Sequence, residues 1–271
     1  MDFYLYLCKM KMKYLIMMKR LCFLSLMLCL LCVACEKDDS IYITVNYPIT
    51  DRYANLDVSN AFDVVVCDTV SEARVTVKGG QHKNVIFKVE NGTLKIGFRS
   101  GLFNWFHGSG KVLLPRNTEL CDVELSGASS FRGDVQGDEV DLEVSGASNF
   151  YGNVKGPEVN IDLSGASDFK GNIDADKIEM EISGSSKVSG AGSCTEILEA
   201  EVSGSSTVDA FGLECRRVTA KVSGSSNVKI SCCESITGSL SGSSDLYYKV
   251  LPGCNPVVNC STSGGSEVHR D

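Results

Sequence analysis

The chain has 271 residues, of which 43% are apolar and 22% are charged. This supplies enough apolar material for a packed core and excludes a chain disordered by composition. The formal net charge is -8 and becomes about −12 without the first 34 residues. Such an acidic chain is excluded from electrostatic binding to nucleic acid, which needs clustered Lys and Arg.

The first 34 residues are typical of an export signal. A basic start precedes an apolar run from Leu21 to Val33, as in secretory signals. The run is about thirteen residues long, which is too short to span a bilayer. Because Met18-Lys19-Arg20 is a more ordinary start for such a signal than Met1, we interpret residues 1–17 as a mis-assigned start.

The signal ends in Cys32-Val33-Ala34-Cys35, which resembles the lipobox of bacterial lipoproteins. The resemblance implies that Cys35 is lipidated and anchors the chain in a membrane. The alternative is a plain signal peptide with a chance cysteine. Residues 35–43 are interpreted as an acidic tether, in which Glu36-Lys37-Asp38-Asp39 resembles a signal for export to the outer face of the outer membrane. We expect a surface-exposed lipoprotein, with a periplasm-facing one as the alternative.

Residues 44–120 are expected to form an irregular N-terminal β region. Six segments starting near Tyr42 are rich in β-branched and aromatic residues, which favours strands. They are Tyr42–Val45, Val64–Val66, Arg74–Lys78, Val85–Val89, Leu94–Phe98 and Lys111–Leu114. Asn91-Gly92 predicts a two-residue hairpin turn. The apolar loop Leu102–His107, which holds Trp105, is expected to cap the open end of the next region.

Residues 121–271 contain an internal repeat, the tetrapeptide Ser-Gly-(Ala/Ser/Gly)-Ser. Its copies begin at Ser126, Ser145, Ser164, Ser183, Ser203, Ser223, Ser241 and Ser263. The copies follow one another at about 19–20 residues, and such a near-constant period is typical of a solenoid.

Apolar residues alternate with polar ones before each tetrapeptide. The positions five, three and one residues before the first Ser are apolar, as in Val140, Leu142 and Val144. Five residues after that Ser the chain is apolar again, with Phe in the first three copies. A period of two predicts short strands with one buried face and excludes a helix. The sequence therefore predicts an all-β fold in which coils stack as a parallel β-solenoid.

The tetrapeptide itself is interpreted as a corner between two strands. Its second residue is Gly in every copy, as expected where the backbone takes a positive φ or approaches a neighbour closely. The serine hydroxyls are expected to bond to backbone in the turn or to the serine one coil away. A catalytic serine is rejected, because the serines are equivalent and have no His partner.

A family resemblance rests on three segments. Asn60–Val66, Val89–Ile96 and Val123–Ser129 resemble the head GIN domain family of putative autotransporter-type adhesins. The resemblance covers residues 50–268. It implies a right-handed parallel β-helix, often in a lipoprotein, and it brings no catalytic residues.

Two outward files of acidic residues are the main candidate site. One file lies two residues before each first Ser and the other lies four residues before it. The first holds Glu124, Glu143, Asp162, Glu181 and Glu201, and the second holds Asp122, Asp141, Asn160, Glu179 and Glu199. Stacked carboxylates about 5 Å apart repel one another, so they favour Ca²⁺ or a basic partner. The alternative is a solvated face that discourages aggregation.

Cysteines and histidines give weaker indications of a functional site than the acidic files do. Cys194, Cys215, Cys232 and Cys233 are placed to meet near one corner, where adjacent coils could form disulfides. The alternative, which we favour, is that they fill small buried positions. The three histidines have no ligand spacing, so no catalytic residue, metal site or cofactor is assigned.

The leading hypothesis is a non-enzymatic envelope lipoprotein that uses a β-solenoid as a surface adhesin or ligand-binding scaffold. Its partner would be a glycan or protein on another surface. The alternatives are a carbohydrate-active β-helix enzyme and a structural spacer. The enzyme is disfavoured because the outward files are poor in Arg and aromatic residues. The sequence does not indicate an oligomeric state.

Overall fold

Strands of one continuous sheet make up most of the computed structural model, which describes residues 41–99 and 108–271. The strands are β1 (Tyr42–Tyr47), β2 (Asn55–Val58), β3 (Phe62–Cys67), β4 (Ala73–Lys78), β5 (Val85–Glu90), β6 (Thr93–Phe98), β7 (Gly110–Pro115), β8 (Asp122–Leu125), β9 (Ser130–Arg132), β10 (Val135–Gln136), β11 (Glu139–Val144), β12 (Asn149–Tyr151), β13 (Val154–Leu163), β14 (Asp168–Ile182), β15 (Lys187–Val202), β16 (Thr207–Val222), β17 (Asn227–Leu240), β18 (Asp245–Val250), β19 (Val257–Thr262) and β20 (Glu267–Arg270). One 3-10 helix, η1 (His82–Asn84), interrupts them. Among the described residues no helix is long and apolar enough to cross a membrane.

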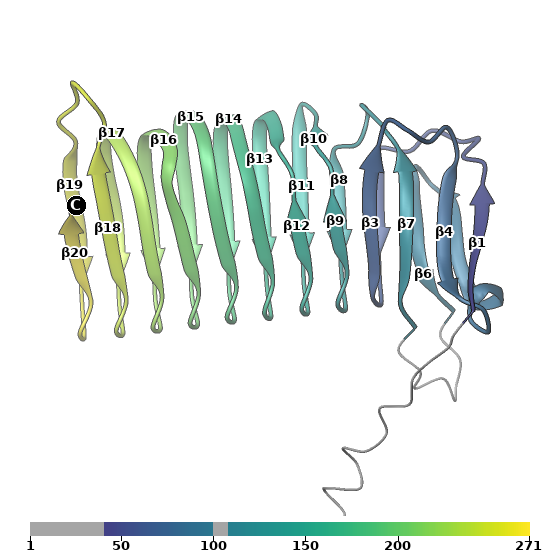
Figure 1. The fold of residues 1–271 in the computed structure, drawn as a ribbon. Coiled ribbons are helices and arrows are strands. Elements are labelled where there is room, and N and C mark those ends of the chain that lie inside the picture. Colours follow the sequence, from purple (N-terminus) through teal and green to yellow (C-terminus); the bar gives the residue numbers. More distant parts are fainter. Residues whose placement is uncertain (1–40, 100–107) are drawn as a thin grey trace, which may run out of the picture. The chain divides into compact units, whose positions relative to one another are not determined.

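The strands stack in parallel as a β-solenoid of about seven turns, which confirms the predicted fold class (Figure 1). Each turn has two sides joined by the tetrapeptide. Side A is the strand segment before the tetrapeptide, and side B is the segment after it. On side A, β11 pairs with β8 and β13, while on side B, β12 pairs with β9 and β14. Later coils run through both sides as single long strands, β14 to β17, because the corner opposite the tetrapeptide stays hydrogen-bonded.

The core lies between the two sides and follows the predicted alternation. The residues one, three and five positions before the first Ser are buried in the inner coils, as are the residues five positions after it. The rings of Phe131, Phe150 and Phe169 stack with centroids 5.4 Å apart. Cys121, which directly precedes β8, is an exception and is only half-buried. Side chains therefore fill the solenoid interior along its length.

The tetrapeptide forms the predicted corner. Its glycines have φ between 75° and 79°, a region that L side chains rarely adopt. They also stack: a Cβ on Gly165 would lie 2.4 Å from the carbonyl oxygen of Gly146. The fourth Ser is buried in every copy. The hydroxyls of Ser129, Ser167, Ser244 and Ser266 donate to the carbonyl of the first Ser, as from Ser167 to Ser164 at 2.8 Å, whereas the Ser206 hydroxyl donates to the carbonyl of Gly184 one coil away. Both expected reasons for Gly therefore apply, and the fourth serines are structural.

The N-terminal region shares the same sheet and confirms its six predicted strands. β5 and β6 form the expected antiparallel hairpin, with Asn91 and Gly92 at positive φ. The sequence missed β2, which pairs with β8 and leads through Asn60 into β3. Asn60 has φ 75° and takes the corner position that Gly holds in later coils. At this end β4 pairs antiparallel with β7 and β1 pairs antiparallel with β4, so they continue side B by two strands. The loop expected to cap this end lies outside the described residues.

Candidate functional site

The structure aligns both predicted acidic files on side A. Registered pairs run from Glu124 through Glu143, Asp162 and Glu181 to Glu201, all of them exposed. The second file is partly buried, and its members pair in the same order. These are Asp122, Asp141, Asn160, Glu179 and Glu199. We call the two files together the acidic strip.

Cations bound the acidic strip at both ends. Asp57 extends the first file by one coil, and its own neighbour on β6 is Lys95. At the other end Glu201 is in register with Lys221, whose ammonium donates to the Glu201 carboxylate. The sequence could have placed Asp57, since it lies two residues before Ser59 just as Glu124 lies before Ser126. The tetrapeptide that begins at Ser59 lacks the repeat's Gly, so this copy of the repeat was not recognised in the sequence.

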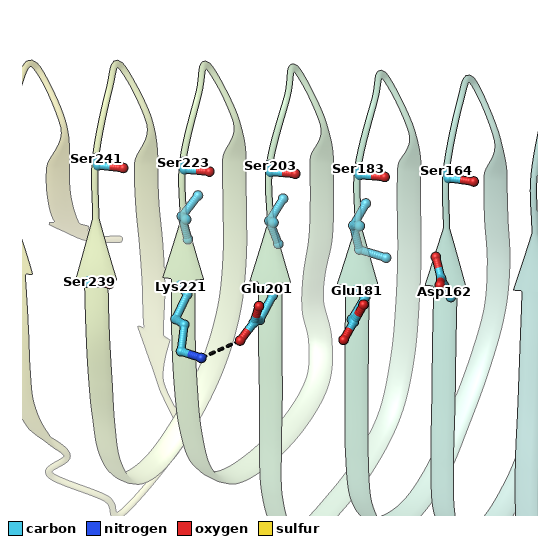
Figure 2. A pocket seen from close by; sticks show the side chains of 13 residues that line it. Asp162, Ser164, Glu181, Ser183, Glu201, Ser203, Lys221, Ser223, Ser239 and Ser241 are labelled. Atoms are coloured by element: carbon cyan, nitrogen blue, oxygen red, sulfur yellow. Dashed lines mark hydrogen bonds and ion pairs between the residues drawn. The ribbon is translucent and has the colours of Figure 1, made fainter.

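A groove of about 440 Å³ lies beside the C-terminal half of the first file. Asp162, Glu181, Glu201 and Lys221 form one wall (Figure 2). The first serines of the corners form a second row next to them. These are Ser164, Ser183, Ser203, Ser223 and Ser241. Figure 2 shows the two rows running in parallel across successive coils, with the dashed ion pair between Lys221 and Glu201. We call this feature the acidic groove.

Burial and neighbouring carboxylates raise the pKa of two groups at the N-terminal end of the strip. Burial, and then the charges of Asp141 and Glu143, raise the pKa of Asp122. Burial raises the pKa of Glu124 as well, with further contributions from Asp57 and Glu143. The carboxylates therefore repel one another at neutral pH, as the spacing predicted.

The strip does not converge on a metal. Within residues 41–99 and 108–271 no group of three or more His, Cys, Asp or Glu side chains is arranged to hold a metal ion. The strands hold the carboxylates in straight files, so successive groups point the same way rather than toward one centre. No ligand set for Ca²⁺ is therefore found among the described residues, and both Ca²⁺ and a basic partner stay predictions.

The four singled-out cysteines separate into two groups. Cys194, Cys215 and Cys232 are buried free thiols in register on adjacent coils, at the corner opposite the tetrapeptide. Cys233 forms a disulfide with Cys254, with a Cα–Cα distance of 4.9 Å. The sequence did not single out Cys254. Cys35, the candidate lipid anchor, and Trp105 lie outside the described residues.

The family assignment comes from a model described as "Putative auto-transporter adhesin, head GIN domain", which matches residues 52–252. The chain belongs to this family. The match includes the three segments that carried the resemblance up to Ser129, and it confirms that resemblance. An adhesin-like family indicates a cell-surface or envelope protein.

Solved structures share the fold. A putative adhesin from Parabacteroides merdae ATCC 43184 has a TM-score of 0.73 and 19% identity, covering 86% of this chain and 97% of its own. A putative adhesin from Parabacteroides distasonis ATCC 8503 has a TM-score of 0.67 and 20% identity, with coverages of 86% and 98%. A putative lipid binding protein from the same strain has a TM-score of 0.60 and 20% identity, with coverages of 86% and 98%. None of the three is described as an enzyme. No curated protein matches the chain.

Proposed function

We propose that the chain is a lipid-anchored protein of the outer membrane surface that binds a partner rich in hydrogen-bond donors along the acidic groove. The observation that carries the proposal is the pairing of two files, one of carboxylates and one of serine hydroxyls. Both repeat at the spacing of stacked strands, about 4.8 Å. An extended ligand can therefore meet equivalent groups on several coils at once.

Charge favours a basic protein segment as the ligand. The groove has three carboxylates, and its single cation, Lys221, is already paired with Glu201. Lys and Arg side chains donate charge-assisted hydrogen bonds to such carboxylates. The serine file supports a second candidate, a neutral glycan whose hydroxyls both donate and accept. Lipid binding, the description of one neighbour, fits less well because the interior is filled and the groove wall is polar.

The surface location is proposed from the leader, in particular Cys35 and the acidic tether after it. Protease shaving of intact cells tests it. A surface protein is degraded without lysis, while a periplasm-facing one survives until the outer membrane is opened. Survival in intact cells would exclude an adhesin.

Binding is tested with whole cells on surfaces coated with a Lys-rich polypeptide or with neutral glycans. The groove variant neutralises three carboxylates: Asp162→Asn, Glu181→Gln and Glu201→Gln. The matched control removes the same charge from exposed side B positions: Asp168→Asn, Asp209→Asn and Glu214→Gln. We expect at least a tenfold loss of polypeptide binding in the groove variant alone, and a decline with added salt. Equal losses in both variants would point to net charge and exclude the groove.

The enzyme alternative is tested separately. Incubation of the full chain with polysaccharides should release no sugars. Release that is lost in Glu143→Gln or Glu181→Gln would replace binding by catalysis as the function of the strip.

A further inference from the structure

The C-terminal end of the solenoid exposes two open sheet edges. β19 pairs only with β17 on side A, and β20 pairs only with β18 on side B. Within the described residues, no strand pairs with their outer edges (Figure 1). Ser263, Glu267 and Asp271 donate their backbone N–H groups to the preceding coil. Since alternate residues of a parallel strand face opposite neighbours, the N–H groups of Val258 and Thr262 face away. We call β19 and β20 the tip.

The tip also carries apolar surface. In the described residues the exposed large hydrophobic side chains are Ile41, Tyr42, Val257 and Val258. Val257 is 68% exposed and Val258 is 36% exposed, while Ile236, the inward neighbour of Val258 on the preceding coil, is 0% exposed. Isolated apolar side chains on a surface need no explanation. Here, however, they lie on an unpaired edge, the arrangement that pairs with another strand.

Natural sheets protect such edges with Lys, Pro or bulges, and β19 has none of these. Its sequence from Val257 to Thr262 contains no charged residue. On β20, Glu267 and Arg270 have opposite signs. Beside it Lys249 pairs with Asp271, and Asp245 lies 3.9 Å from His269. The tip is thus neutral in a chain that is strongly acidic. A second copy can approach it without the repulsion that the acidic strips would cause elsewhere.

We propose that the tip binds the tip of a second copy, with β19 pairing antiparallel to its counterpart. If the two-fold axis passes through side A and side B, β19 meets β19 of the second copy and β20 meets β20 of the second copy. For its cellular setting this contact rests on the proposed function, since it would join copies on facing cells. The chain enters the sheet at β1, at the end opposite the tip (Figure 1).

For copies that stand upright on one membrane, the length of the tether excludes head-to-tail stacking. Residues 35–41 span at most about 25 Å when fully extended. Seven turns at about 4.8 Å each make a stack of about 34 Å. A copy seated on another's tip could therefore not keep its own anchor in the same bilayer. The tip-to-tip contact has no such conflict.

The test measures self-association of the full detergent-solubilised chain by sedimentation over a range of concentrations. We expect a dimer with a measurable dissociation constant. Val258→Lys places a charge in the edge, and Thr262→Pro removes an outward-facing N–H group without adding charge. Each should weaken the dimer at least tenfold. The control Asn172→Lys adds the same charge to an exposed side B position far from the tip and should leave the dimer unchanged.

Two results would overturn the contact: a wild-type chain that stays monomeric at about 100 μM, or a dimer that survives both tip variants. Circular dichroism shows whether each tip variant folds. If one of them does not fold, the dissociation constant of the other variant tests the contact. The groove variant should dimerise normally, and tip variants should still bind the coated surfaces. Loss of surface binding with an intact dimer would therefore reject the proposed function alone, while loss of the dimer with intact binding would reject the tip contact alone.

Discussion

A corner glycine has two possible reasons, its positive φ and the close approach of the backbone one coil before, and glycine substitutions can separate them. Gly165 has φ 77°, and a Cβ there would lie 2.4 Å from the carbonyl oxygen of Gly146. Gly92 has the same φ of 77° in the β5–β6 hairpin, but a Cβ there would meet nothing within 4 Å. Gly92→Ala should therefore cost only the left-handed conformation of Ala, about 1–2 kcal/mol. Gly165→Ala adds a steric conflict with rigid backbone, worth about 1–3 kcal/mol more.

Thermal unfolding followed by circular dichroism measures the difference. A loss of 1 kcal/mol lowers Tm by about 2–4 °C in a chain of this size. We expect Gly92→Ala to lower Tm by about 2–8 °C and Gly165→Ala to lower it clearly further. Gly165→Asn gives a second check, because Asn tolerates a positive φ, as Asn60 does at 75°, yet still adds a Cβ. Equal effects at Gly92 and Gly165 would refute stacking of the corners as a reason for Gly.

Three further outcomes follow from the packing and the charges. Phe150→Ala should cost about 3–5 kcal/mol, measured by urea unfolding, because it empties a fully buried site between two stacked rings. Because the pKa of Asp122 and of Glu124 is raised by folding, the folded state binds protons more readily than the unfolded state. Their ionisation therefore removes stability as pH rises, and Tm should increase from neutral pH down toward the ordinary carboxyl range; Asp122→Asn with Glu124→Gln should flatten that increase. Breaking the Cys233–Cys254 disulfide, which closes a separation of 21 residues, should cost about 3 kcal/mol and raise hydrogen exchange in β18 to β20 before the inner coils.

The repeat made the inner coils predictable because every copy places equivalent residues in equivalent surroundings. A further regularity was present but not used. Seven residues after the first Ser the early copies have Gly, as in Gly133 and Gly152, and the later ones have Ala210 and Ile230. The Gly copies include all three with Phe five residues after the Ser, and a Cβ on Gly133 would lie 3.0 Å from the Phe131 ring. At Gly152 and Gly171 a Cβ would instead lie 1.7 Å from the carbonyl oxygen of the Gly one coil before, so close backbone stacking requires Gly at these positions.

The first coil and the disulfide escaped prediction for different reasons. Ser59-Asn60-Ala61-Phe62 lacks both the Gly and the fourth Ser, so the structure was needed to identify it as a corner, from the φ of Asn60 and the hydrogen bond that Ala128 N–H donates to the Asn60 carbonyl. Cys254 lies between β18 and β19, in a segment with no equivalent in other copies. The repeat pattern predicts only those positions that have equivalents in several copies. The partner of Cys233 required the path of the chain in space.

Variation in coil length lies on side B, as between Ser189 and Ala191, and at the corner opposite the tetrapeptide. The paired strands of side A show no register shift, and this is why the acidic groove remains straight. The register shifts lie between Ala175 and Lys177 in one coil and between Ala210 and Glu214 in another. The tetrapeptide corner has no such freedom, because stacked glycines and buried serines fix its position relative to the coil before. Glu181, Glu201 and Lys221 therefore remain in register although their coils differ in length. Insertions can change one corner of this solenoid without disturbing the face that we propose binds a partner.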